Sequence, residues 1–104
     1  MKKLSDTVIY AISIKGVDIL KSSHRFCAII EDLSPQLVKD ISFIKKAYSD
    51  QLGELIYMAA TANKINKETR VNEIKKYLKT EEGRDKKWVD RILRYFAKCI
   101  YDNE

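Results

Sequence analysis

The chain has 104 residues, of which 45% are hydrophobic and 34% are charged, and its formal net charge is +5. This length allows one domain with a single core but little room for a large buried active-site cavity, and the composition is too apolar for a disordered chain. No apolar run approaches the roughly 18 residues of a membrane-spanning helix, and polar residues soon interrupt the Met-Lys-Lys start, so we expect a cytoplasmic protein without a membrane segment.

Helical spacing begins close to the start of the chain. Val8 and Ile12 lie four residues apart, behind a cap at Ser5 or Asp6. Gly16 follows the last apolar position, where a helix end requires a left-handed residue. The pattern predicts a short first helix that ends at this glycine.

A second and a third helix are expected next. Residues 17–20 form a brief apolar turn, after which Ser22 or Ser23 caps the second helix. The apolar positions expected to face the core from this helix are Phe26, Cys27, Ile29, Ile30 and Leu33. Ser34-Pro35 then supplies a serine for the cap and a proline for the first helical position, so we predict that a third helix starts there.

Three further helices complete the predicted fold. The third helix runs to Ser49, Asp50 caps a fourth, and a polar loop at 63–66 precedes a fifth that ends near Gly83. The last helix is expected at about 84–101. The apolar positions expected in the core are Leu37, Ile41, Ile44, Tyr48, Leu52, Leu55, Ile56, Ala59, Val71, Ile74, Tyr77, Leu78, Trp88, Ile92, Tyr95, Phe96, Cys99 and Ile100.

No segment shows the sustained alternation of apolar and polar residues that is typical of a strand. We therefore predict an all-α fold with one compact domain over residues 1–104. It is a bundle of six short, largely antiparallel helices, give or take one, because short connections make sequential helices neighbours.

The stretch 16–35 gathers most of the unusual chemistry of the chain. His24 and Cys27 would share a helix face, but Cys27 falls on the apolar stripe, where a buried thiol has a raised pKa and low reactivity. Glu31 and Asp32 are adjacent, so on a helix their side chains point about 100° apart and do not face one another. One histidine and two distant cysteines fit no zinc-site spacing. We expect no catalytic residue, no metal, no cofactor and no small-molecule substrate.

We interpret the same stretch as a structural corner made by Gly16, Arg25, Asp32 and Pro35. In this interpretation Gly16 ends the first helix, and the Asp32 carboxylate lies near the positive end of the helix that starts at Pro35. Arg25 lies two turns before Asp32 on the same face and reaches toward it.

The basic excess belongs to the C-terminal part of the chain. Residues 1–63 hold eight Lys or Arg and seven Asp or Glu, whereas residues 64–104 hold twelve and eight. This bias suits nucleic acid or an acidic protein surface as a partner. Acidic residues are interspersed among these basic ones, which favours an ordinary solvated helical face. The acidic residues are Glu68, Glu73, Asp85 and Asp90.

One pattern resembles a known family. The residues that carry it are Gly16, Ile19-Leu20, Arg25-Phe26, Ile30, Asp32-Leu33, Pro35, Asp40-Ile41, Ile44 and Ala47. The pattern is similar to a small all-helical module of bacterial multidomain proteins, which is attached to kinase, protease, chaperone-like or repeat domains in signalling and defence. That module resembles death-fold adaptors and effector-associated domains in role. The resemblance covers about residues 8–60, departs from the family at Asp40, where glutamate is usual, and implies protein–protein interaction.

We therefore expect a non-enzymatic, adaptor-like bacterial domain that docks to another protein or to copies of itself. The basic residues expected to contact the partner are Arg70, Lys75, Lys79, Lys87, Arg91 and Arg94. The alternative is a small basic protein that uses its C-terminal helices to bind nucleic acid or to act as a regulator. That alternative uses Lys86, Lys87, Arg91, Arg94 and Lys98, with Trp88 and Tyr95 nearby.

Overall fold

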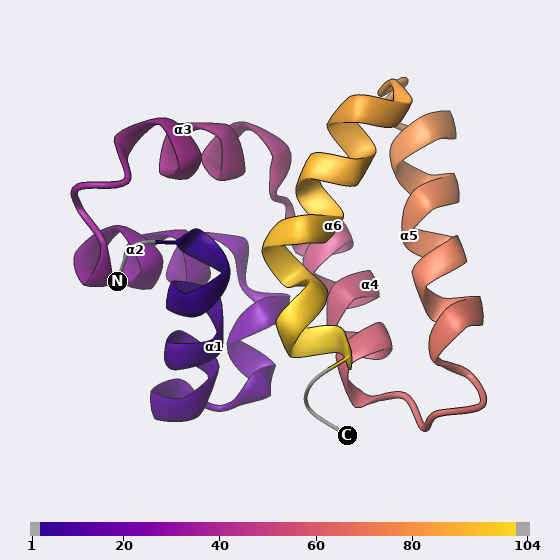
Figure 1. Cartoon of the computed structure of the whole chain (residues 1–104), viewed down its shortest axis with the longest axis horizontal. Coiled ribbons are helices and arrows are strands. Elements are labelled where there is room, and N and C mark those ends of the chain that lie inside the picture. Colours follow the sequence, from indigo (N-terminus) through magenta and orange to yellow (C-terminus); the bar gives the residue numbers. More distant parts are fainter. Residues whose placement is uncertain (1–2, 102–104) are drawn as a thin grey trace.

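The computed structural model describes residues 3–101, which form six α-helices and one short 3-10 helix (Figure 1). The elements are α1 (Leu4–Lys15), η1 (Val17–Lys21), α2 (Ser23–Leu33), α3 (Val38–Ala47), α4 (Asp50–Thr61), α5 (Lys67–Thr80) and α6 (Lys86–Tyr101). The described part contains no strand, so the predicted all-α bundle of six helices is confirmed. None of these helices combines the length and the apolar character that a membrane span requires.

The helices form two groups around one core. Helix α5 runs antiparallel to α4 on one side and to α6 on the other (Figure 1). Helices α2 and α3 form a second antiparallel pair that lies across α1. Helix α1 packs against α6, α2 and η1, and α6 also packs on α4 and α5, so α6 is central to the bundle. The Cα radius of gyration is 12.6 Å, close to the value of about 13 Å for a domain of this size.

Helix α1 begins slightly earlier than predicted. The expected cap at Ser5 or Asp6 is wrong, because the carbonyl of Lys3 already accepts hydrogen bonds from the amides of Asp6 and Thr7. The predicted end of the helix is confirmed, with Gly16 at a φ of 88°. That left-handed conformation is open to glycine and strained for residues that carry a Cβ.

The start of α3 at Ser34-Pro35 is also a wrong prediction. Residues 34–37 form a turn in which the Leu37 amide donates to the Ser34 carbonyl at 3.0 Å, and α3 begins only at Val38. The side chain of Ser34 is buried, with its hydroxyl oxygen 2.6 Å from that of Thr7 in α1. Ser34 does not cap α3, because the helix begins after Leu37 and the Ser34 hydroxyl is used in the interior hydrogen bond.

The caps of α4 and α2 also differ from the predicted ones. Ser49, and not Asp50, caps α4, since its hydroxyl accepts a hydrogen bond from the Leu52 amide at 3.1 Å. Asp50 instead accepts a hydrogen bond from the Ser23 amide at 2.8 Å, at the start of α2, where neither serine side chain makes a capping bond. This bond lowers the pKa of the Asp50 carboxyl group. A residue 27 positions away thus stabilises the N-terminus of α2.

Three aromatic rings hold the two groups of helices together. Phe26 stacks on Tyr48 with 4.7 Å between ring centroids, and Phe96 lies 5.8 Å from Phe26 and 5.6 Å from Tyr48. The Tyr48 hydroxyl donates to the Leu20 carbonyl, and burial raises the pKa of this phenol. Gly53 lets η1 approach α4, because a Cβ there would lie 2.1 Å from the Leu20 carbonyl oxygen. The core therefore depends on a glycine in the first turn of α4.

Most predicted core positions are buried. The exceptions are half-buried side chains at the margin of the core, and they are Cys27, Ile29, Leu33, Leu37, Leu55, Tyr77, Trp88 and Tyr95. Trp88 and Tyr95 lie on the side of α6 that faces α3, where both rings contact Phe43.

Candidate functional site

Arg91 of α6 is held against α3. Its guanidinium carbon lies 3.9 Å from the ring centroid of Phe43, its Nε donates to the Tyr95 hydroxyl at 3.0 Å, and its Nη2 lies 3.6 Å from Asp40 Oδ1. Arg91 is therefore already engaged with α3, and its role as a partner contact stays a prediction. Its side chain is half-buried and links α6 to α3.

The two aromatic residues of the nucleic-acid alternative lie in the same cluster. The ring of Trp88 lies 5.2 Å from that of Phe43, and the Arg84 guanidinium covers Trp88 at 4.3 Å. The Tyr95 hydroxyl donates to Asp40 Oδ1 at 2.6 Å, and burial together with this carboxylate raises the pKa of Tyr95. Both rings are thus engaged within the protein, and neither forms an open stacking platform.

A groove between α5 and α6 brings two of the predicted contact residues together. Lys75 and Arg94 line it, with Asp90 as the acidic residue on its wall. Its apolar lining is made by Val71, Leu93, Ala97 and Tyr101. The groove has a volume of about 290 Å³. Neither Lys75 nor Arg94 takes part in an ion pair within residues 3–101, so both charges are available to a ligand.

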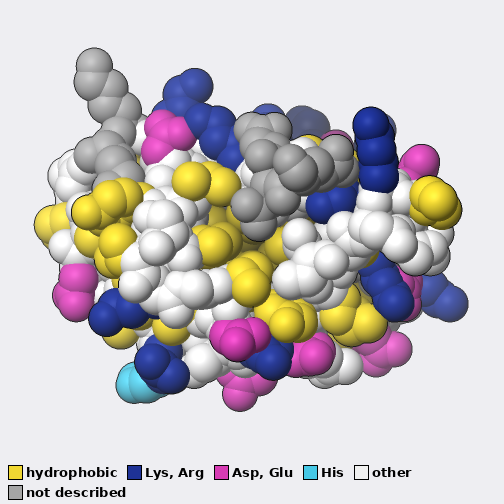
Figure 2. Space-filling model, turned by 90° about the horizontal axis from the view of Figure 1, so that it is seen from below, with side chains coloured by type: hydrophobic (Ala, Val, Ile, Leu, Met, Phe, Trp, Pro, Cys, Tyr) yellow, Lys and Arg dark blue, Asp and Glu magenta, His cyan; other side chains and the backbone are white. Residues whose placement is uncertain are grey.

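The other predicted contact residues do not form one patch with this pair. Arg70 is bound to Glu73, with 3.0 Å between Nη1 and Oε1, while Lys79 and Lys87 are exposed. Seen from below, the molecule shows basic and acidic side chains side by side, with hydrophobic ones between them (Figure 2). The six basic residues therefore divide into a groove pair, two bound arginines and two separate exposed lysines.

A second groove, between α4 and α5, was missed by sequence reasoning. It has a volume of about 630 Å³ and lies on the flank of α5 opposite to Lys75. Its lining residues are Gln51, Glu54, Leu55, Glu73, Lys76, Tyr77, Thr80 and Glu81. The available signal was the recurrence of Glu73, Tyr77 and Glu81 every four residues, which places them on one helical stripe.

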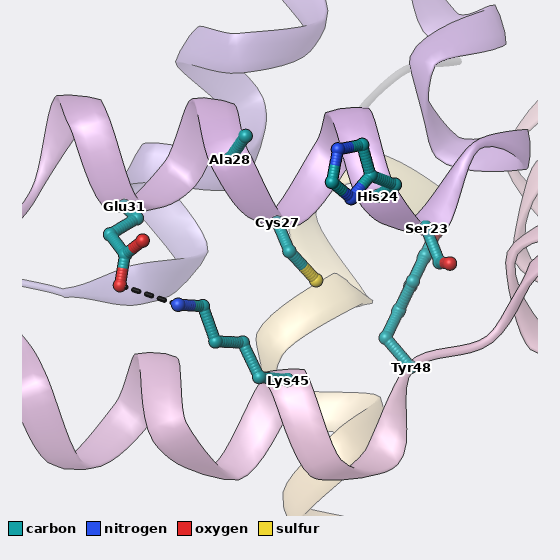
Figure 3. A pocket seen from close by; sticks show the side chains of 7 residues that line it. All are labelled: Ser23, His24, Cys27, Ala28, Glu31, Lys45 and Tyr48. Carbon is teal, nitrogen blue, oxygen red and sulfur yellow. Dashed lines mark hydrogen bonds and ion pairs between the residues drawn. The ribbon is translucent and has the colours of Figure 1, made fainter.

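The thiol of Cys27 lines a third, open pocket, between α2 and α3. Its volume is about 370 Å³, and Lys45 Nζ crosses it to Glu31 Oε2 at 2.7 Å (Figure 3). Cys27 points toward α3, whereas the ring of His24, which also lines the pocket, lies in front of α2 in this view. Desolvation raises the pKa of Cys27, so the thiol stays protonated near neutral pH. The side chains gathered here do not form a nucleophile and base pair.

Cys99 and Lys67 occupy the interior at the end of α6. Burial raises the pKa of Cys99 to about 12, and its thiol donates to the Phe96 carbonyl. Lys67 is also buried, and its ammonium group donates to the Ile100 carbonyl, near the negative end of α6. Both groups therefore contribute to the structure at the C-terminal end of α6.

The predicted corner is held by other residues than expected. Arg25, Asp32 and Pro35 are all exposed, and none of the ion pairs or hydrogen bonds within residues 3–101 joins Arg25 to Asp32. Because α3 starts at Val38, Asp32 also does not lie at its first turn. The interior hydrogen bond between Ser34 and Thr7 holds the corner, and the exposed Glu31–Lys45 ion pair joins α2 to α3 beside it.

Taken together, the fold and its grooves define a small all-α protein with two open interhelical grooves on the flanks of α5. No protein-family model matches the chain, and neither a curated protein nor a solved structure matches it. Within residues 3–101, no group of three or more His, Cys, Asp and Glu side chains is placed to hold a metal ion.

Proposed function

We propose that this chain is a non-enzymatic, adaptor-like domain that docks to another protein through the α5/α6 groove. The observation that carries the proposal is the position of Lys75 and Arg94, two unpaired basic side chains on a groove with an apolar lining. An acidic segment with an apolar side chain complements this surface. The apolar contact supplies affinity, and the charges steer the encounter.

Nucleic acid fits this surface less well than protein does. Of the basic residues on α6, Arg91 is paired with Asp40 and Lys98 with Asp6, so two of them already have an acidic partner in the same chain. Asp90 also lines the groove, where it would repel phosphates. These three features favour a protein partner.

The resemblance to a bacterial interaction module agrees with this proposal but does not locate the surface. Its pattern includes Ile19, Leu20, Phe26 and Ile30, all of which are buried. Buried residues specify packing and not the choice of a partner. A role in bacterial signalling or defence therefore stands as part of the proposal, and the α5/α6 groove is where we place the contact.

The experiment compares the protein with the double variant Lys75→Glu, Arg94→Glu as bait in a nuclease-treated lysate of the native host. We expect the unmodified bait to retain a protein that the variant does not retain. The captured protein, once purified, should bind the variant at least about tenfold more weakly than it binds the unmodified domain. Binding that weakens as salt rises is part of the expectation.

The matched control is Arg25→Glu with Lys39→Glu, which makes the same change of charge on α2 and α3. Both positions are exposed and lie in the first turn of their helices, where an acidic residue is tolerated. Equal loss of the partner from both double variants would reduce the effect to net charge and contradict the proposal. Binding that disappears after nuclease treatment would favour nucleic acid.

A further inference from the structure

The α4/α5 groove differs in charge from the rest of this basic chain. Glu54 and Glu81 are exposed on its two sides, and neither is in an ion pair within the described residues. Glu73 also lines it but is held by Arg70 at 3.0 Å, and Lys76 is its one basic lining residue. The groove therefore has a negative rim on a chain with a net charge of +5.

Its lining combines these charges with apolar surface. Leu55 of α4 and Tyr77 of α5 are half-buried and line the groove between the carboxylates. The volume of about 630 Å³ compares with about 290 Å³ for the α5/α6 groove. A metal ion would gain nothing from the leucine and the aromatic ring, whereas a peptide can use both the carboxylates and the apolar lining.

We propose that this groove is a second docking site, which takes a basic segment of another protein that carries an apolar side chain. In the bound state the apolar side chain contacts Leu55 and Tyr77, and flanking Lys or Arg residues lie against Glu54 and Glu81. Charge complementarity selects this occupant, because an acidic segment would face two unpaired carboxylates.

The site goes beyond the proposed α5/α6 contact and changes what the domain does. Helix α5 is the common wall of both grooves, with Lys75 on one flank and Tyr77 on the other. An acidic segment on the first flank and a basic segment on the second can be bound at the same time. The domain would then bridge two different partners. Either proposed docking site can be disproved without affecting the other.

The test is a selection from random twelve-residue peptides displayed on phage, with the protein as target. The double variant Glu54→Lys, Glu81→Lys serves for counter-selection, after its helical circular dichroism and unfolding midpoint have been compared with those of the unmodified protein. We expect enriched peptides with at least two Lys or Arg around a leucine or an aromatic residue. Synthesised with a fluorescent label, they should bind the variant at least tenfold more weakly and should bind the protein more weakly at 500 mM than at 50 mM salt.

A control for charge reversal away from the groove is Asp32→Lys, at one exposed carboxylate on α2 that has no ion pair within residues 3–101. It should bind the selected peptides within twofold of the unmodified protein. Should the double lysine variant unfold, Glu54→Gln with Glu81→Gln replaces it. The proposal is overturned by peptides without basic residues, by equal binding to the variant, or by no enrichment. It is also overturned if sedimentation shows a dimer that the variant loses, because the occupant is then a second copy of the chain.

Discussion

Arg91 of α6 lies over the ring of Phe43 in α3, with 3.9 Å between its guanidinium carbon and the ring centroid. The same side chain reaches Asp40, so α3 and α6 are joined by one cation that contacts both a ring and a carboxylate. A basic residue that looks like a partner contact in the sequence is thus part of the structure.

Arg91→Ala should therefore destabilise the protein, whereas Arg94→Ala should not. The lost cation–π contact and the lost, partly exposed ion pair together correspond to about 1–3 kcal/mol of unfolding free energy. Arg94 is exposed, lines the α5/α6 groove and makes no ion pair within the described residues, so it provides the matched control, with an expected change within about 0.5 kcal/mol. Urea unfolding measures both. Equal stability of the two variants would mean that the α3–α6 contact is absent in solution.

Trp88→Ala should cost less than a substitution in the centre of the core. Trp88 is half-buried between Phe43 and Arg84, so we expect a loss of about 1–2 kcal/mol. Phe96 is fully buried, and Phe96→Ala should cost about 3–5 kcal/mol. Thermal unfolding of the two variants gives the comparison. If Trp88→Ala costs as much as Phe96→Ala, the indole is more deeply packed than its exposure indicates.

The sequence predicts the number and type of the elements because helical spacing is a local property. Gly16 and the polar loop at 63–66 mark boundaries that the structure confirms. The cap positions were less predictable, since Ser34 bonds to Thr7 and Asp50 to the start of α2. Such tertiary hydrogen bonds compete with local capping and leave no trace in local spacing.

The candidate site was only partly predictable for the same reason. Lys75 and Arg94 come together because α5 and α6 pack side by side, which fits the prediction that sequential helices are neighbours. The engagement of Arg91 depends on Asp40 and Phe43, about fifty residues earlier in the chain. The acidic groove likewise combines Glu54 of α4 with Glu81, which directly follows α5. Charge counts along the chain cannot separate paired from available side chains.

Gly53→Ala should destabilise the protein although alanine is the better helix former. At a solvent-exposed position inside a helix, a change from glycine to alanine stabilises the protein by about 1 kcal/mol. Here the new Cβ would lie 2.1 Å from the Leu20 carbonyl oxygen, so η1 must move away from α4, at a cost of about 1–3 kcal/mol. Urea unfolding measures the change, with Gln51→Ala at an exposed position of the same helix as control. A gain of stability for Gly53→Ala would mean that η1 does not approach α4 so closely.

The hydrogen bond from the Ser23 amide to Asp50 should appear in the pH dependence of stability. This bond lowers the folded-state pKa of Asp50 below its ordinary value of 3.8, so the unfolded chain binds the proton more readily. The stabilisation is therefore present above the unfolded pKa and is lost as pH falls through the folded pKa. An asparagine oxygen can still accept the Ser23 bond but does not titrate. In Asp50→Asn, the melting temperature should fall less steeply between about pH 5 and pH 2 than in the unmodified protein. Asp32→Asn controls for the removal of one carboxyl group from the chain, and parallel curves for the unmodified protein and Asp50→Asn would rule out this role of Asp50.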